Sequence, residues 1–397
     1  MLSSTQRCSI VLFIFVSGCC LLGHPSFAQS SSDQSLPNAF RSKDSRSAAT
    51  PTMQIDTSAF GTVDGQAITR YTLTNSHGHR VHVMNYGATL LEVEVPDRDG
   101  KLANVNLCFQ TLQPYVDGHP YFGSTVGRFC NRIGNARFTI DGTEYTLVVN
   151  HGKHQLHGGK KNFAYQVWSA ETQSEGDAVS VKMVHESPGG DNGFPGKVTA
   201  TAEYRWNDAN ELVITYSAVT DAATHVNLTN HSYWNLGGAG TGTARDHIAT
   251  IHADQSLAVD DDLIPTGQLV DVAGTPLDFR TATALGDRLD QLPATKGYDH
   301  CYVVRGKIGE RRNAAFVLDP DSGRTLEIET TQPGIQLYTA NHLGGGPANA
   351  NSGAHEAFCL ETQHYPDSPN KPSFPSTLLR PGQTMREVTV HRFGVSK

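Results

Sequence analysis

A histidine and a glutamate far apart in the sequence each lie within a short, polar segment. His231 lies within residues 229–236 (TNHSYWNL), and Glu361 lies within residues 359–366 (CLETQHYP). Near neutral pH an imidazole can donate a proton and a carboxylate can accept one. Held on opposite sides of a small substrate, the two groups form a general acid/base pair. Such a pair suits a reaction that needs only two proton transfers, with no metal and no cofactor.

Further segments carry side chains that are suited to holding the hydroxyl groups of a ligand. Arg132 offers a planar fork of N–H donors, and its neighbour Asn131 can both donate and accept. Asp299 stands at the start of a predicted strand, and Gln336 lies on another. His157, followed by two glycines, fits a polar wall where the backbone comes close to a ligand. Taken singly, each residue also fits a structural explanation, such as a turn, a strand cap or a surface position.

The surroundings of the acid/base pair bear on its chemistry. Residues 357–360 (AFCL) predict a short apolar strand before Glu361, and burial at its end would raise the pKa of that carboxyl group. Tyr233 and Trp234 are expected to form an aromatic platform on which a sugar stacks its apolar face. The alternatives are a hydrogen-bonded core histidine at position 231 and an exposed glutamate at the end of a strand.

Three histidines have a spacing that a metal site can use: His151, His154 and His157. No carboxylate stands at a fitting position beside them. On a glycine-rich loop, moreover, this spacing does not place the three rings on one side. We therefore expect neither a metal ion nor a cofactor.

The segments that must position these residues are predicted to be β-strands. Many short stretches alternate apolar and polar side chains and end in Gly, Asp, Asn or Pro. The clearest of them are residues 91–95, 212–218, 316–318 and 326–328. Asp141-Gly142 predicts a two-residue hairpin turn, and only residues 282–292 suggest a helix. The pattern favours an all-β sandwich or barrel, with no composition break that would divide residues 54–397.

Composition excludes some classes of function. The 397 residues carry a formal net charge of −8, which disfavours nucleic acid as a partner because such proteins present a basic face. Four of the seven cysteines lie in the predicted domain, too few for a disulfide scaffold and without the CxxC spacing of structural zinc. They are expected to be small buried side chains, with one disulfide left as an alternative: Cys108, Cys130, Cys301 and Cys359.

The N-terminus has the pattern of an exported protein. Arg7 precedes the apolar run 10–16, which is too short to span a bilayer as a mature helix. Residues 26–28 (SFA) place small side chains at the usual cleavage spacing, so residues 1–28 are predicted to be a signal peptide. A periplasmic or secreted protein without a stable membrane span is the expectation.

Two other features of this region affect that expectation. Residues 16–19 (VSGC) look like a bacterial lipobox, in which case a lipid on Cys19 would anchor the protein to a membrane. Residues 29–53 are polar and nearly free of apolar side chains, so they are predicted to be a disordered linker. The folded domain is then expected to cover residues 54–397.

Taken together, these segments resemble the aldose 1-epimerase (galactose mutarotase) family. The resemblance covers essentially all of residues 54–397, and its specificity lies in the order and spacing of its motifs. The matching motifs are residues 127–133 (GRFCNRI), 156–159 (LHGG), 229–236 (TNHSYWNL), 297–300 (GYDH), 333–336 (PGIQ) and 360–363 (LETQ). Cys130 and Trp234 depart from the residues expected there, but neither carries proton chemistry. The resemblance implies a large antiparallel β-supersandwich with an open sugar cleft, in a monomer or a homodimer.

The resemblance and the residue chemistry predict the same reaction. Glu361 removes the proton of the C1 hydroxyl of an aldohexose such as glucose or galactose, while His231 protonates the ring oxygen. The opened aldehyde rotates about its C1–C2 bond and closes to the opposite anomer. His157 supports the ring-oxygen side. Four side chains are expected to hold the remaining hydroxyls: Asn131, Arg132, Asp299 and Gln336.

Other functions fit parts of the pattern. A hexose-6-phosphate 1-epimerase would want a basic cluster for the phosphate, and only Lys160-Lys161 lies near a site motif. A non-catalytic carbohydrate-binding protein would need no acid/base pair. A glycosidase or polysaccharide lyase of related fold is disfavoured because glycosidases usually place two carboxylates around one bond.

Overall fold

The computed structural model describes residues 52–396 of the chain. The predicted signal peptide, residues 1–28, and nearly all of the predicted linker, residues 29–53, lie outside the described residues. Within them strands dominate, and the one α-helix is the short α1 (Gln113–Asp117). No helix in this part of the chain is long and apolar enough to cross a bilayer. The prediction of an all-β fold is confirmed.

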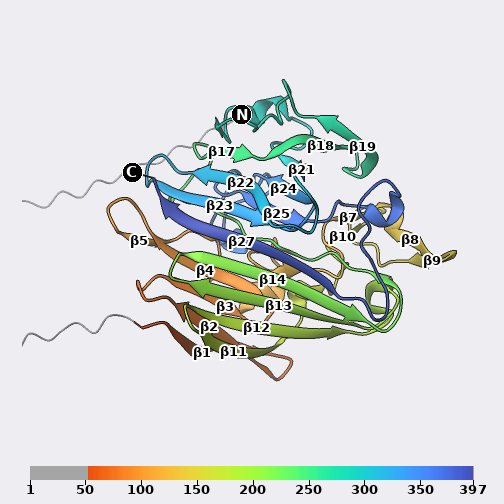
Figure 1. Ribbon diagram of the computed structural model, residues 1–397, viewed down its shortest axis with the longest axis horizontal. Helices are drawn as coiled ribbons and strands as arrows, with labels where there is room; N and C mark the ends of the chain where they lie inside the picture. Colours follow the sequence, from red (N-terminus) through yellow and green to blue (C-terminus); the bar gives the residue numbers. More distant parts are fainter. Residues whose placement is uncertain (1–51, 397) are drawn as a thin grey trace, which may run out of the picture. The chain divides into compact units, whose positions relative to one another are not determined.

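Three large antiparallel sheets carry most of the strands (Figure 1). The first sheet has the order β1 (Gln54–Val63), β2 (Gln66–Thr74), β3 (Arg80–Met84), β4 (Thr89–Pro96) and β5 (Leu102–Asn104). The second has the order β11 (Ser169–Glu175), β12 (Ala178–Ser187), β13 (Val198–Asn207), β14 (Glu211–Thr220), β27 (Met385–Val395), β23 (Arg324–Thr330), β22 (Arg312–Leu318), β17 (Ile248–Ile251) and β20 (Thr283–Ala284). The third has the order β19 (Pro265–Asp271), β18 (Ala253–Val259), β21 (Asp299–Val304), β24 (Gly334–Tyr338) and β25 (Cys359–Gln363).

Four short ladders stand apart from these sheets. Four pairs of strands form them: β6 (Thr125–Val126) with β16 (Thr229–Asn230), β7 (Arg132–Ile133) with β10 (Gln155–Leu156), β8 (Arg137–Ile140) with β9 (Thr143–Thr146), and β15 (Thr224–His225) with β26 (Leu378–Leu379). Single 3-10 turns occur between them at Gly134–Ala136, Phe163–Tyr165, Asp191–Gly193, Leu289–Gln291, Pro347–Asn349 and Ser368–Asn370.

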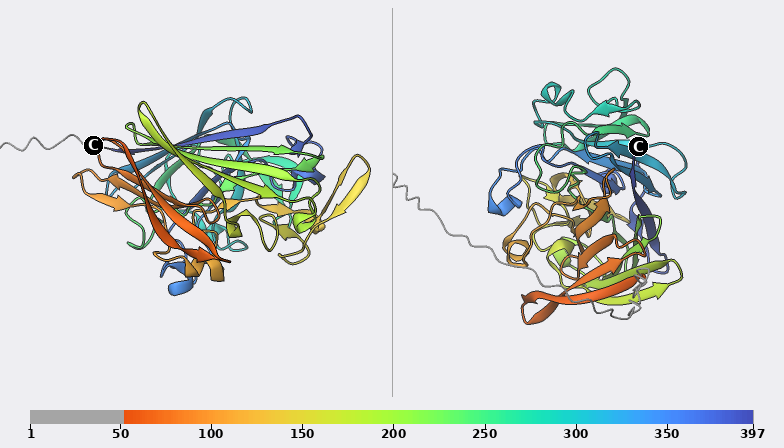
Figure 2. Two further views of the ribbon diagram at one scale, coloured as in Figure 1. Left: turned by 90° about the horizontal axis from the view of Figure 1, so that it is seen from below. Right: turned by 90° about the vertical axis from the view of Figure 1, so that its left-hand side faces the viewer.

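One continuous core lies between the nine-stranded sheet and the two five-stranded sheets. It takes Val93 from β4, Ile214 from β14 and Leu337 from β24 into a single cluster of buried apolar side chains. In Figure 2 the red and orange strands of the first sheet lie across the green strands of the nine-stranded sheet. A buried guanidinium also joins two sheets, because Arg324 of β23 donates to the carbonyl of Val95 in β4. The predicted sandwich therefore has three sheets around a shared interior.

The strand predictions are confirmed where side chains alternate. In β14 the even-numbered residues from Leu212 to Ala218 are buried, whereas their neighbours are partly exposed, as half-buried strands require. Asp141 and Gly142 both have positive φ (51° and 83°) between β8 and β9, which is the backbone of a type I′ turn. The suggested helix over residues 282–292 is wrong: this segment contains β20 and the 3-10 turn Leu289–Gln291. The four cysteines of the described residues are free thiols.

Candidate active site

Three neighbouring strands of the third sheet place three predicted residues side by side. Gln336 of β24 stands directly opposite Glu361 of β25. Asp299 of β21 stands opposite Tyr338, two residues along from Gln336, so its side chain leaves the same face of the sheet. Alternate residues of these strands leave the other face and enter the main core. The two-residue period therefore gives this sheet one polar and one apolar face.

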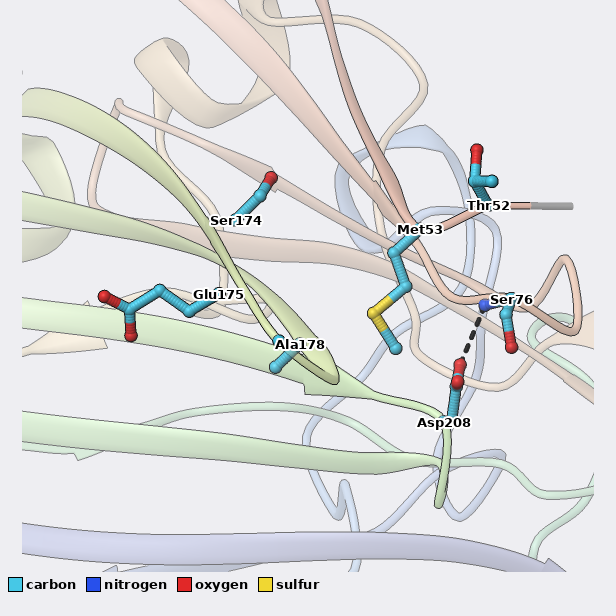
Figure 3. A pocket seen from close by; sticks show the side chains of 8 residues that line it. Thr52, Met53, Ser76, Ser174, Glu175, Ala178 and Asp208 are labelled. Atoms are coloured by element: carbon cyan, nitrogen blue, oxygen red, sulfur yellow. Dashed lines mark hydrogen bonds between the residues drawn. The ribbon is translucent and has the colours of Figure 1, made fainter.

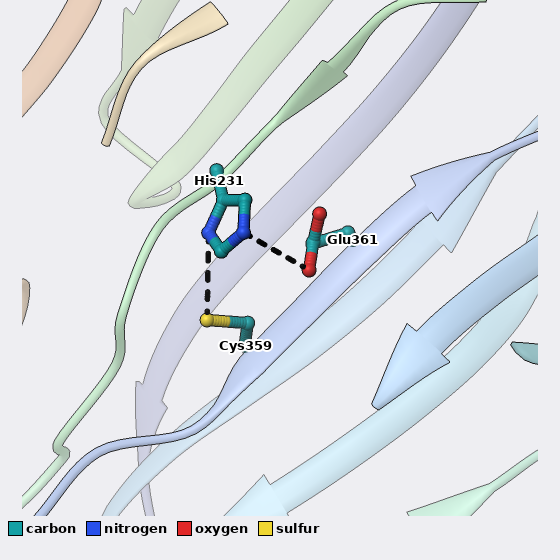
Figure 4. Close-up of side chains that lie close together, drawn as sticks. All are labelled: His231, Cys359 and Glu361. Atoms are coloured by element: carbon teal, nitrogen blue, oxygen red, sulfur yellow. Dashed lines mark hydrogen bonds and ion pairs between the residues drawn. The ribbon is translucent and has the colours of Figure 1, made fainter. Parts of the chain in front are cut away.

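His231 reaches the polar face from another segment. It follows β16, where the Thr229 hydroxyl donates to the carbonyl of Thr362 in β25 over 2.9 Å. This contact holds the end of β16 against β25. Nε2 of His231 then lies 3.6 Å from Oε1 of Glu361, and both side chains are buried (Figure 4). The predicted acid/base pair is therefore assembled in space.

Aromatic rings fix the plane of the His231 imidazole. The ring of Tyr233 stacks on it at 5.1 Å between centroids and 19° between planes, and that of Tyr121 at 5.9 Å and 27°. Because the ring plane is fixed, its two nitrogens have defined directions. Nε2 faces Glu361, whereas Nδ1 lies 3.7 Å from Sγ of Cys359 (Figure 4).

The two-residue ladder of β7 and β10 holds the residues of the opposite wall. Leu156 pairs with Arg132, and the residues beside this pair, Asn131 and His157, both have positive φ (60° and 52°). The backbone N–H of His157 donates to the carbonyl of Asn131 over 2.9 Å. In return, the backbone N–H of Asn131 donates to Nδ1 of His157 over 3.2 Å. Since Nδ1 accepts, a neutral His157 carries its proton on Nε2 and can donate from there.

Gly158 allows the His157 loop to lie against the backbone of Gly127, just after β6. It has φ 82°, and a Cβ atom at this position would lie 2.3 Å from the carbonyl oxygen of Gly127. Such a contact is far too short for any side chain. The close approach that the glycines predict is therefore made to the protein's own backbone.

A partly buried network of hydrogen bonds joins the residues predicted to hold hydroxyls. Nη2 of Arg132 lies 3.2 Å from Oδ2 of Asp299, and Nε2 of Gln336 donates to Oδ1 of the same carboxylate over 2.6 Å. Nη1 of Arg132 also donates to Oδ1 of Asn131 over 3.3 Å. Because these groups hold one another, they are oriented before a ligand arrives. Fixed donors and acceptors of this kind suit adjacent hydroxyl groups.

These walls enclose a cavity of about 310 Å³, within the usual range of small-molecule sites. Six of the seven predicted site residues line it, and Gln336 lies buried behind Asp299. The chemical roles of these residues stay predictions. The full lining is Pro120, Tyr121, Asn131, Arg132, His151, Leu156, His157, His231, Tyr233, Leu263, Asp299, Tyr338, His342 and Glu361.

Burial sets the proton affinities in this cavity. Desolvation, followed by repulsion from Asp299, raises the pKa of Glu361 well above its ordinary value, and Arg132 opposes this rise. Desolvation also lowers the pKa of His231 to about 4 and moves that of His157 well below its ordinary value. His231 and Glu361 are close enough to titrate as a unit. Both shifts favour the uncharged forms, a protonated carboxyl group beside a neutral imidazole.

Only one of the two rings predicted to form an aromatic platform lines the cavity. Tyr233 lines the cavity, but Trp234 is buried in the core, 5.5 Å from the ring of Phe393. Successive residues of an extended chain point to opposite sides, so the two rings cannot share a wall. Tyr121 and Tyr338 supply the other aromatic lining. Sequence reasoning missed Tyr121 because it lies in the loop after α1, at φ 65°, where no strand pattern marks it.

The spaced histidines do not converge. Nδ1 of His154 accepts from the backbone N–H of Asn135 over 3.0 Å, and its Nε2 lies 3.2 Å from Asp262. Both ring nitrogens are therefore engaged away from the cavity. His151 and His157 line the cavity, but His154 does not.

His231, Cys359 and Glu361 each offer a ligand atom, and these atoms lie within 4.8 Å of one another, but their directions do not suit one shared metal ion. Cys359 faces Nδ1 of His231, whereas Glu361 faces Nε2. The lone pairs of these two nitrogens point away from each other in the ring plane. One ion bound to a single nitrogen is thus poorly placed to reach both the sulfur and the carboxylate at normal zinc distances.

A second hollow, of about 440 Å³, lies where β1 begins (Figure 3). One of its polar groups is Asp208, whose Oδ1 accepts from the backbone N–H of Ser76 over 2.8 Å. No histidine lines this hollow and no acid/base pair faces it. Of these two hollows, the one that contains His231 and Glu361 has the side chains for acid/base chemistry.

Comparison with known proteins agrees with this geometry. The family model described as aldose 1-epimerase matches residues 69–392. The chain is 43% identical to the galactose mutarotase of Bos taurus over 320 residues. This alignment covers 80% of this chain and 92% of that protein. It is 37% identical over 337 residues to the aldose 1-epimerase of Escherichia coli (strain K12), covering 83% of this chain and 96% of that protein.

Solved structures give the same result for the fold. The galactose 1-epimerase of Lactobacillus acidophilus NCFM superposes with a TM-score of 0.79 at 27% identity, covering 87% of this chain and 100% of that one. An aldose epimerase homologue from C. elegans superposes with a TM-score of 0.75 at 31% identity, covering 82% of this chain and 98% of that one. The chain therefore belongs to the aldose 1-epimerase family of isomerases.

Proposed function

We propose that this chain interconverts the α and β anomers of aldohexoses, with glucose and galactose as substrates, through His231 and Glu361. The observation that carries the proposal is the 3.6 Å separation of Nε2 and Oε1 at the wall of a cavity that also contains the Arg132–Asp299 pair. Its relatives named galactose mutarotase and aldose 1-epimerase support the same reaction.

The pair starts each turnover with one proton. In the empty cavity the raised pKa of Glu361 and the lowered pKa of His231 favour a neutral carboxyl group beside a neutral imidazole. Moving that proton from Oε1 to Nε2 gives a carboxylate and an imidazolium without any change in proton count. This second form is the one that holds both a base and an acid.

Ring opening then returns both groups to their neutral forms. The carboxylate of Glu361 takes the proton of the C1 hydroxyl, the C1–O5 bond breaks as the C1 carbonyl forms, and Nε2 of His231 gives its proton to O5. Rotation about C1–C2 presents the other face of the aldehyde. On closure O5 attacks C1, its proton returns to Nε2, and Glu361 returns a proton to the new C1 hydroxyl. Each proton-transfer group of this kind typically contributes about 10²–10⁴-fold to the rate.

The remaining residues are assigned to binding. Nε2–H of His157 is available to donate to the ring-oxygen side, because Nδ1 is occupied by the backbone of Asn131. Arg132, Asp299 and Asn131 present donors and acceptors to the other hydroxyls, and Gln336 fixes the carboxylate of Asp299 from behind. Tyr233 offers a ring face for the apolar side of the sugar.

The cavity disfavours a phosphorylated sugar. Its one permanently charged basic residue is Arg132, already paired with Asp299, and Lys160-Lys161 does not belong to the lining. A phosphate dianion needs free cationic donors. A purely binding role is disfavoured because a binding protein gains nothing from burying the His231–Glu361 pair.

Polarimetry tests the proposal directly. Freshly dissolved α-glucose, α-galactose and α-glucose 6-phosphate are each followed to equilibrium with the purified protein, with and without a chelator. We expect the protein to accelerate the first two and to do so equally with chelator. Rates no faster than the spontaneous reaction would refute the proposal, and a preference for the phosphate would support the 6-phosphate epimerase instead.

We also propose that residues 1–28 are removed on export and that the protein acts in the periplasm or outside the cell, as a monomer or a homodimer. The support is the apolar run 10–16 followed by small residues at 26–28. The mass of the protein from fractionated cells tests this. A soluble chain that begins near residue 29 supports it, a lipid-modified Cys19 in the membrane supports anchoring, and an uncleaved chain in the cytoplasm contradicts both.

A further inference from the structure

One strand faces both nitrogens of the His231 ring. Cys359 and Glu361 are two residues apart on β25, so their side chains leave the same face of the sheet. Sγ of Cys359 lies 3.7 Å from Nδ1, and Oε1 of Glu361 lies 3.6 Å from Nε2 (Figure 4). Because Tyr121 and Tyr233 fix the ring plane, each of these two atoms is the hydrogen-bonding or proton-transfer partner of one ring nitrogen.

The proton exchanged with Glu361 uses Nε2 alone. In the form with a protonated carboxyl group, Nε2 must accept, so the neutral imidazole carries its own proton on Nδ1. In the imidazolium form Nδ1 is again protonated. Nδ1–H is thus required throughout the cycle, and a buried N–H without an acceptor is unfavourable.

Among the side chains of residues 52–396, the one that the structure places within hydrogen-bonding reach of Nδ1 is Cys359, through its sulfur. We propose that Cys359 is a positioning residue, whose sulfur accepts Nδ1–H and so keeps Nε2 as the nitrogen that exchanges protons with Glu361 and the sugar. This inference rests on the function proposed above for His231 and Glu361.

A thiol suits this task better than a carboxylate. A carboxylate at Nδ1 would stabilise the imidazolium and so weaken His231 as an acid. Sulfur is only a weak acceptor, so it directs the proton without holding the positive charge. Burial raises the pKa of the Cys359 thiol well above its ordinary value, which keeps the group neutral at the pH of the reaction. The same burial makes this cysteine a poor nucleophile.

Two substitutions separate orientation from packing. Cys359→Ala removes the acceptor, and Cys359→Ser restores a neutral acceptor on a shorter bond. Cys301→Ala is the matched control, because Cys301 is also buried and leaves the same face of the sheet from β21, but its sulfur lies near the carbonyl of Tyr302. ¹⁵N NMR of the imidazole reads the tautomer without any substrate, and comparison with His231→Gln assigns the signal.

For the wild type we expect the Nδ1–H tautomer of His231. Cys359→Ala should give a mixture of tautomers and lower kcat by about 10- to 100-fold, as when partners behind ligating histidines are removed, with KM little changed. Cys359→Ser should recover the tautomer and most of kcat, and Cys301→Ala should alter neither.

Two results would overturn the inference. One is an Ala variant that keeps the wild-type tautomer and kcat, and the other is a Ser variant that loses both as fully as Ala does. If Cys359→Ala does not fold, the tautomer in Cys359→Ser decides alone. A wild type that shows the Nδ1–H tautomer but no mutarotation would refute the proposed function and leave the hydrogen bond established.

Discussion

Glu361→Gln is the change that tests the proposed chemistry most directly. The amide keeps the shape of the side chain and can still hydrogen-bond, but it cannot take the C1 hydroxyl proton. Losing one proton-transfer group should lower kcat by about 10²–10⁴-fold, which corresponds to roughly 3–5.5 kcal/mol in the activation barrier. KM should change little, because Arg132, Asp299 and Asn131 still hold the hydroxyls.

The same substitution should leave the fold as stable as before, or more so. Burial raises the pKa of Glu361, so between its unfolded and folded pKa values the folded state holds a proton that the unfolded state has lost. Stability therefore falls as pH rises through this window. A neutral Gln removes that penalty and also removes the repulsion from Asp299. The free energy of unfolding above pH 4.5, the ordinary pKa of the group, should be equal or higher.

A second histidine–glutamate pair supplies the control. Nε2 of His364 lies 3.1 Å from Oε1 of Glu387, but neither residue lines the cavity. Glu387→Gln makes the same chemical change and should keep the wild-type polarimetric rate on α-galactose. An unchanged rate in Glu361→Gln, or equal losses in both variants, would refute the assignment of the base. Urea unfolding of each variant shows whether either loss reflects a damaged fold.

Three further outcomes follow from the site and its loop. The pH profile of kcat/KM should be bell-shaped: activity rises as pH passes the pKa of His231 near 4, where the pair loses its second proton, and falls where Glu361 loses the last one, well above 4.5. A profile without an alkaline limb would contradict the one-proton pair. Asp299→Asn should raise KM about 10- to 100-fold through lost charged hydrogen bonds and, because Asp299 raises the pKa of Glu361, move the alkaline limb to lower pH. A limb that stays in place would exclude this coupling. Gly158→Ala should lower the free energy of unfolding, measured in urea, by about 1–3 kcal/mol. The reasons are that Gly158 has φ 82° and that a Cβ atom there would meet the carbonyl of Gly127. A variant as stable as the wild type would show that the loop can move.

Local features of the fold could be predicted because they depend on neighbouring residues. The alternation in β14 and the turn at Asp141-Gly142 express constraints within a few residues, and both are confirmed. The ladders β6–β16 and β7–β10 are two residues long, too short to show any period. These ladders nevertheless contain Arg132 and directly precede His231. The strands that position part of the site therefore could not be recognised from the sequence.

The candidate site could be predicted from its motifs but not from the geometry that joins them. Polar segments around His231 and Glu361 were recognisable, whereas their 3.6 Å contact depends on how β16 meets β25. Trp234 was misassigned because side-chain direction in its segment is set by long-range pairing with Phe358. Cys359 was predicted to be a small buried residue, and its contact with His231 follows from the register of β25 alone.

The place of β27 in the nine-stranded sheet has a consequence for how the chain matures. This strand comes last in the sequence, yet it lies between β14 and β23, as the dark blue ribbon in Figure 1 shows. Until residues 385–395 leave the ribosome, both of these neighbours have an open hydrogen-bonding edge, which invites aggregation. The nine-stranded sheet, together with the shared interior that it covers, is therefore complete only once residues 385–395 have been made. Loss of residues 385–395 would leave β14 and β23 without their common neighbour and so divide the nine-stranded sheet in two.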